Sequence, residues 1–140
     1  MLRRQLLVTA LATACALPCF AFTPASGARI GVLSDGRPAT QFRTELVDVI
    51  ATAGFTPDSY SDVDKGNRPF RRLGRKWVAT FSHKQLQRVS IQVFVDADGK
   101  ASIWISESMS EKLSAETRSV VEKILINSRE RFGAEKVTKE

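Results

Sequence analysis

Residues 88–106 read RVSIQVFVDADGKASIWIS, and this stretch decides the fold class. Apolar and polar residues alternate along 88–95 and again along 101–106, which is the period of a strand with one face in a core. Between the two runs, residues 96–99 (DADG) supply a glycine for the left-handed position of a tight turn. The stretch therefore predicts an antiparallel β-hairpin.

The alternation places two large aromatic side chains, Phe94 and Trp104, opposite the valines and isoleucines of the hairpin. Helices are expected to cover the aliphatic face. Phe94 and Trp104 would then stand beside Arg88 on the other face, as in a binding surface. The alternative is that the long loop of residues 55–74 folds over them.

Two amphipathic helices flank the strand region. Residues 38–53 carry apolar side chains at intervals of three and four residues, and Gly54 follows as a left-handed end. Residues 114–132 repeat this pattern, and the Ser114 hydroxyl can cap the first turn. The sequence therefore predicts one helix before the strands and one after them.

The order of the elements predicts an α+β fold. A third alternating run, residues 76–82, precedes the hairpin, and a further short strand is expected near residue 30. We expect a two-layer sandwich in which an antiparallel sheet of three to four strands carries two helices on one face, in the order α-β-β-β-α. Residues 29–133 would form this single domain, after a flexible leader (22–28) and before a charged tail (134–140).

The first 21 residues have the pattern of a secretory signal peptide. Arg3 and Arg4 precede an apolar run over residues 6–17, and Pro18 then ends any helix. Small residues at the positions that signal peptidase reads predict cleavage near Ala21. We therefore expect a periplasmic or secreted protein.

Cleavage would also simplify the chemistry of the chain. Both cysteines, Cys15 and Cys19, lie in the removed segment, so neither a disulfide nor a thiolate would remain. Without Arg3 and Arg4, 19 Lys and Arg residues stand against 15 Asp and Glu, which is a net charge of +4.

The apolar run of residues 6–17 is shorter than the about 20 residues of a membrane-spanning helix, so no transmembrane span is expected after cleavage. Twin-arginine export and lipidation of a cysteine are the alternatives.

Positive charge is concentrated in one stretch. Residues 65–95 contain eight basic residues and no acid. Gly and Pro between these residues indicate a loop, and positive charges cannot be buried without partners. The side chains should therefore project into solvent and attract an envelope protein or an anionic surface. Nucleic acid is disfavoured by the compartment. The expected partner-binding residues are Arg68, Arg71, Arg72, Arg75, Lys76, Arg88, Phe94 and Trp104. The alternative is that these charges only keep a loop and an edge strand solvated.

No motif predicts a metal, a cofactor or a catalytic centre. Asp96 and Asp98 resemble the start of a calcium loop, but its further oxygen ligands are missing, so a turn is expected. His83 is the only histidine, and neither zinc-binding cysteines nor a Gly-x-Ser-x-Gly elbow accompany it. The long loop adds three aspartates: Asp58, Asp62 and Asp64.

The sequence therefore predicts a small exported binding or accessory protein without catalysis. Two other classes stay open: an inhibitor or immunity-type protein that blocks an envelope enzyme, and a small hydrolase that uses His83 or the loop aspartates. Catalysis would need a pocket that joins His83 to a carboxylate. An inhibitor would present a protruding loop or a flat patch.

Overall fold

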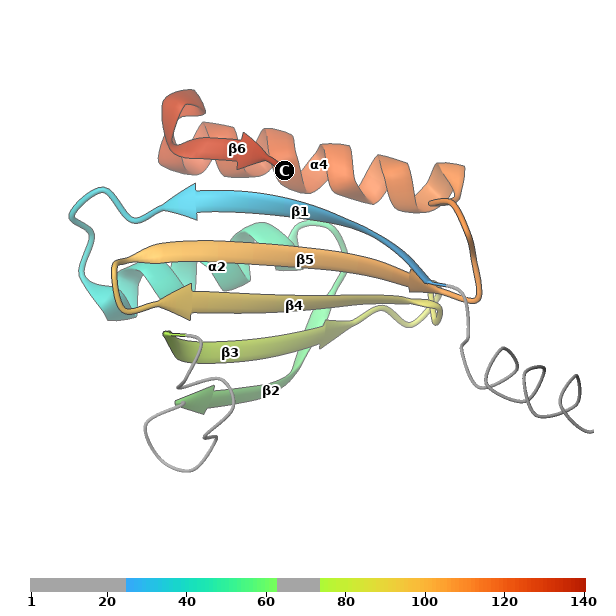
Figure 1. Cartoon of the computed structure of the whole chain (residues 1–140), viewed down its shortest axis with the longest axis horizontal. Helices are drawn as coiled ribbons and strands as arrows, with labels where there is room; N and C mark the ends of the chain where they lie inside the picture. The colour runs from blue at the N-terminus through green and yellow to red at the C-terminus, as the bar shows by residue number, and fades with distance from the viewer. Residues whose placement is uncertain (1–24, 63–73) are drawn as a thin grey trace, which may run out of the picture.

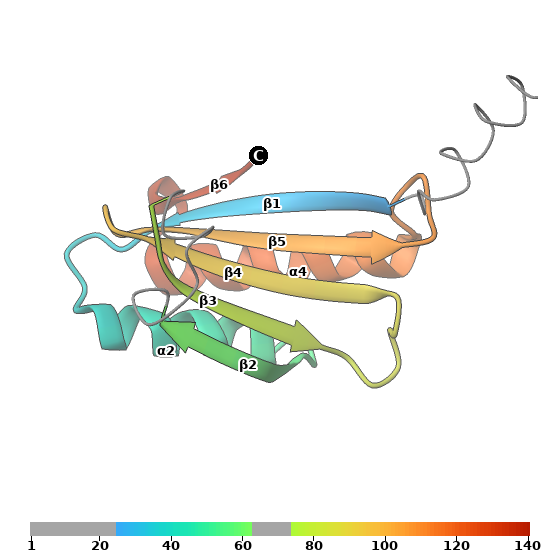
Figure 2. The same ribbon diagram turned by 60° about the horizontal axis from the view of Figure 1, so that its bottom comes forward.

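The computed structural model describes residues 25–62 and 74–140. In these ranges a six-stranded antiparallel sheet carries two α-helices on one side (Figures 1 and 2). The predicted α+β class, the antiparallel sheet and the two helices are confirmed. The predicted strand number is wrong, because the sheet has six strands and not three or four. The predicted signal peptide and three of the expected binding residues, Arg68, Arg71 and Arg72, lie outside the described residues.

In chain order the elements are β1 (Ala25–Leu33), α2 (Ala39–Ala51), β2 (Thr56–Asp62), β3 (Arg75–Ser82), β4 (Val89–Asp96), β5 (Lys100–Ser108), α4 (Ala115–Phe132), a 3-10 turn η2 (Ala134–Lys136) and β6 (Val137–Lys139). Across the sheet the strands follow the order β2-β3-β4-β5-β1-β6. The strands β2 to β5 thus form a meander, and β1 lies between β5 and β6. None of the described helices is long and apolar enough to cross a membrane.

The predicted hairpin is confirmed as β4 and β5. Gly99 has a φ of +83°, and its N–H donates to the Asp96 carbonyl over 3.1 Å. The register pairs Val93 with Ile103, and both side chains point into the core. The turn glycine thus fixes the pairing that the alternation requires.

The strand expected near residue 30 is present as β1 but is longer than expected, and the two additional strands, β2 and β6, lie in segments with weak sequence patterns. β1 begins at Ala25, inside the predicted leader, and its first residues are small. β2 lies in the predicted loop, contains Pro57 and is irregular between Pro57 and Ser59. β6 lies in the predicted tail and buries only Val137. These strands owe their pairing to their neighbours in the sheet, which an alternation count along one segment does not capture.

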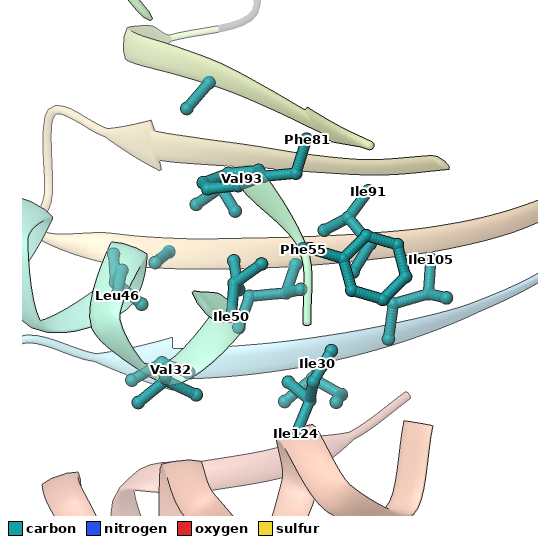
Figure 3. Close-up of a cluster of buried hydrophobic side chains, with 14 of the residues drawn as sticks. Ile30, Val32, Leu46, Ile50, Phe55, Phe81, Ile91, Val93, Ile105 and Ile124 are labelled. Atoms are coloured by element: carbon teal, nitrogen blue, oxygen red, sulfur yellow. The ribbon is translucent and has the colours of Figure 1, made fainter. Parts of the chain in front are cut away.

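The helices bury their apolar faces in one common core. α2 contributes Leu46 and Ile50, and α4 contributes Ile124, which meet the side chains of Ile30 and Ile105 from the sheet (Figure 3). α4 begins where predicted, since the Ser114 hydroxyl accepts a hydrogen bond from the Thr117 N–H over 3.2 Å. Gly133 follows the helix with a φ of +99°.

Candidate binding face

The side of the sheet opposite the two helices is called the open face here. The strand register shows which side chains lie on this face. Arg29 on β1 lies directly opposite Trp104 on β5, and Trp104 lies opposite Gln92 on β4. Phe94 on β4 lies opposite Val78 on β3. Because side chains alternate across a strand, all five point away from the aliphatic core.

Phe94 and Trp104 pack against each other on this face. Their ring centroids lie 5.3 Å apart in an edge-to-face arrangement. Phe94 is only 4% exposed and packs with Val78, whereas Trp104 keeps part of its surface accessible. The two aromatics therefore share a face as expected, but Phe94 is buried there and Trp104 provides the accessible aromatic surface.

Each ring also carries an arginine. The Arg29 guanidinium carbon lies 3.9 Å from the Trp104 ring centroid, and that of Arg75 lies 4.9 Å from the Phe94 centroid. Arg75 also pairs with Asp96, with 2.6 Å between Nη1 and Oδ1. Within the described part of the chain Arg29 forms no ion pair. Arg29 is therefore a cation on this face that, among the described residues, is available to a bound anion.

A hollow of about 520 Å³ lies beside Trp104 and the first residues of β1. It is lined by Ser26, Gly27, Ala28, Arg29, Gln92, Trp104, Ile105, Ser106 and Glu140. Its walls combine one aromatic ring, one guanidinium group, small polar groups and the Glu140 carboxylate, whose charge is paired with Lys100 over 3.2 Å. Such a mixture suits a ligand with apolar and anionic parts.

The expected basic surface is divided by the fold. Arg75 starts β3 and faces Asp96, while Arg88 precedes β4 at the opposite end of the same strand pair. Since β3 has eight residues, these ends lie roughly 24 Å apart. The structure therefore brings Arg75 to Phe94, and places Arg88 at the other end of the strand pair. Lys76 is exposed next to Arg75.

Arg88 lies instead near the buried carboxylate of Glu107, which caps α4. The Glu107 Oε2 atom accepts hydrogen bonds from the Ser114 N–H over 3.1 Å and from the Ser114 hydroxyl over 3.0 Å. A hydrogen bond from the Thr117 side chain, those from Ser114 and the charge of Arg88 hold the pKa of Glu107 below its ordinary value, against the opposing effect of burial. This carboxylate stabilises the start of α4, and its hydrogen bonds indicate a structural role.

The candidate hydrolase residues His83 and Asp58 also form hydrogen bonds with neighbouring groups of the fold. The Nδ1 atom of His83 accepts hydrogen bonds from the backbone N–H groups of Gln85 and Leu86. Asp58 accepts a hydrogen bond from the Ser82 hydroxyl over 2.8 Å. In residues 25–62 and 74–140, no three His, Cys, Asp or Glu side chains are grouped as a metal site would require. The Asp62 side chain and Asp64 are not among the described groups.

Sequence reasoning missed Arg29 and the hollow beside it. The signal was the alternation of residues 27–32, in which Gly27, Arg29 and Gly31 share one side and the apolar residues share the other. Glycines weaken such a pattern, so only a short strand was expected there. A comparison with protein-family models and a comparison with curated proteins find no match to this chain.

Proposed function

We propose that this protein is an exported, non-catalytic binding or accessory protein of the cell envelope, which engages an anionic partner through its open face. The observation that carries the proposal is the Arg29 guanidinium stacked on Trp104 beside a hollow. A cation that is held against an aromatic ring loses little conformational entropy on binding, and its outer side remains accessible to an anion.

The basic residues of the stretch 65–95 belong to the same proposal. Arg75 lies over Phe94, and Lys76, Arg71, Arg72 and Arg68 precede or follow it closely in sequence. Their positive charges would attract an anionic partner, because several like charges close together in the chain raise the local concentration of the opposite charge. Arg88, at the other end of the strands, would contribute only at long range.

Binding to two anionic probes tests this proposal. The probes are polyglutamate and vesicles that contain phosphatidylglycerol, each offered at low and at high salt. We expect binding to at least one probe, a loss of affinity as salt rises, and weaker binding by Trp104→Ala. Ile126→Ala, which removes an exposed side chain on the outer side of α4, is the control and should bind as the unmodified protein does.

Absence of binding to both probes at low salt would refute the proposal. So would equal binding by the unmodified protein and Trp104→Ala, provided that circular dichroism shows both to be folded. That second result would assign the binding to charges away from the open face.

A further inference from the structure

The outer edge of β1 is paired along only part of its length. β6 pairs with residues 30–32, and the Glu140 N–H donates to the Arg29 carbonyl. Figure 1 shows β6 beside the C-terminal part of β1 only. Since the N–H and C=O of one residue in an antiparallel strand point to the same side, those of Gly27 point outward like those of Arg29. No described residue pairs with this outer edge at residues 25–28.

The two ends of the sheet differ in how they discourage further pairing. The edge strand β2 contains Pro57, a register irregularity and Asp58, which are features that block the addition of a strand. The unpaired part of β1 has none of these features. Its residues Ser26, Gly27 and Ala28 are small, and Gly27 is exposed.

The paired part of β1 shows how one acidic side chain fits this edge. Thr138 of β6 lies opposite Gly31, and Glu140, directly after β6, donates its N–H to the Arg29 carbonyl. The Glu140 carboxylate reaches Gly31, so that a Cβ on this glycine would lie 3.0 Å from Oε1. The same carboxylate pairs with the Lys100 ammonium on β5 over 3.2 Å. A glycine of β1 thus makes room for an acid that directly follows the neighbouring strand, and a basic residue on the open face binds it.

Two of these parts, a glycine and a cation, recur four residues earlier. Gly27 lies on the same side of β1 as Gly31, and a Cβ on it would lie 3.1 Å from the Ile105 carbonyl oxygen of β5. The hollow that Trp104 and Glu140 line lies beside it. Arg29 supplies the cation at that point. A side chain from an added strand, placed opposite Gly27, would lie diagonally from Arg29, at a distance that Glu and Arg side chains can bridge.

We propose that the partner is an extended acidic peptide segment that adds to the outer edge of residues 25–28 as a further strand, with a carboxylate over Gly27 that pairs with Arg29. This inference rests on the proposed function and specifies its partner. Main-chain hydrogen bonds supply affinity, and alternate side chains enter the hollow beside Trp104, as in other cases of strand addition. A neighbouring apolar residue of the peptide can pack on the Trp104 ring.

The test uses the isotope-labelled protein and a capped peptide of alternating Val and Glu. We expect the NMR signals of the Gly27 and Arg29 amides and of the Trp104 indole to shift on titration. A second peptide with the same sequence but N-methylated backbone amides should not bind, because it cannot donate to the strand edge. Arg29→Gln should lower the affinity for the first peptide about tenfold, since the substitution removes a charge-assisted contact. Arg118→Gln on α4 is the matched control and should leave the affinity unchanged.

Three results would overturn the inference. They are no binding of the Val–Glu peptide, equal binding of the N-methylated peptide, or shifts confined to residues away from β1. If phosphatidylglycerol vesicles bind and the peptide does not, the proposed function stands and the inference is wrong. If the peptide, the vesicles and polyglutamate all fail to bind, both are wrong.

Discussion

At the scale of single residues, the contacts of His83 depend on a glycine in another segment. The His83 ring lies edge-on to Phe55, with 5.0 Å between ring centroids, and its Nδ1 atom holds two backbone N–H groups. Its Nε2 atom lies 2.7 Å from the point that a Cβ on Gly54 would occupy. Gly54 also has a φ of +89°, in the region that favours glycine.

Gly54→Ala should therefore destabilise the protein for two reasons. The left-handed backbone costs about 1–3 kcal/mol for a residue with a Cβ, and the new methyl group would also displace the His83 ring. Denaturant unfolding monitored by circular dichroism measures the loss in the free energy of unfolding. We expect a lower midpoint with an unchanged slope.

Gly36→Ala separates these two causes. Gly36 has a φ of +76°, but no atom lies within 4 Å of the Cβ position, so only the backbone cost applies. Gly54→Ala should cost more than Gly36→Ala, and the excess should shrink in a His83→Ala background. Equal costs for the two glycine variants would show that His83 moves aside without loss.

At the scale of elements, the start of α4 is tied to the sheet by one carboxylate. Glu107 on β5 accepts hydrogen bonds from Ser114, and the Ser114 hydroxyl in turn accepts the Thr117 N–H. The chain from β5 to α4 is therefore closed into a loop by side-chain contacts at the helix N-terminus. A negative charge at this end is also favoured by the helix dipole.

This arrangement predicts a pH dependence of stability. Because the folded protein lowers the pKa of Glu107, chiefly through the Thr117 and Ser114 hydrogen bonds, the carboxylate stabilises the fold above the ordinary glutamate pKa. That contribution is lost as pH falls from the ordinary value through the lowered one. Glu107→Gln should reduce the melting temperature at neutral pH, and the difference from the unmodified protein should narrow across this acidic window.

Glu111→Gln is a suitable control for that measurement. Glu111 is exposed in the loop before α4, and its substitution should leave the melting temperature almost unchanged at every pH. A constant difference between Glu107→Gln and the unmodified protein from neutral to acidic pH would contradict the role given to the Glu107 charge.

The same elements show what the sequence could predict and what it could not. β4, β5 and α4 have strong local patterns, so the Asp96–Gly99 turn and the Ser114 cap were both predictable. The ion pair between Arg75 and Asp96 was not, because residues 65–95 contain no acid and the partner comes from across a strand pair. The free edge of β1 likewise depends on where β6 ends, which is a property of the assembled sheet.

At the scale of the whole molecule, one core joins both helices to the central strands. The buried side chains of α2, α4 and the sheet form a single cluster, and the Phe94 and Val78 pair on the open face is separate from it. β1 lies between β5 and β6, so the first and last described strands are neighbours. No part of this core can therefore be lost without loosening the rest, and we expect cooperative unfolding.

Ile103→Ala tests this expectation at the centre of the sheet. Ile103 is fully buried on β5 and is paired on both sides, with Ile30 and with Val93. Its truncation should lower the free energy of unfolding by about 2–5 kcal/mol, since it removes buried methyl groups and leaves a cavity. Ile126→Ala, at an exposed site on α4, should change it by about 0.5 kcal/mol or less. For both variants, tryptophan fluorescence and far-UV circular dichroism should give one coincident transition. If the two signals separate in Ile103→Ala, the helices and the sheet unfold independently, and the single-core description is wrong.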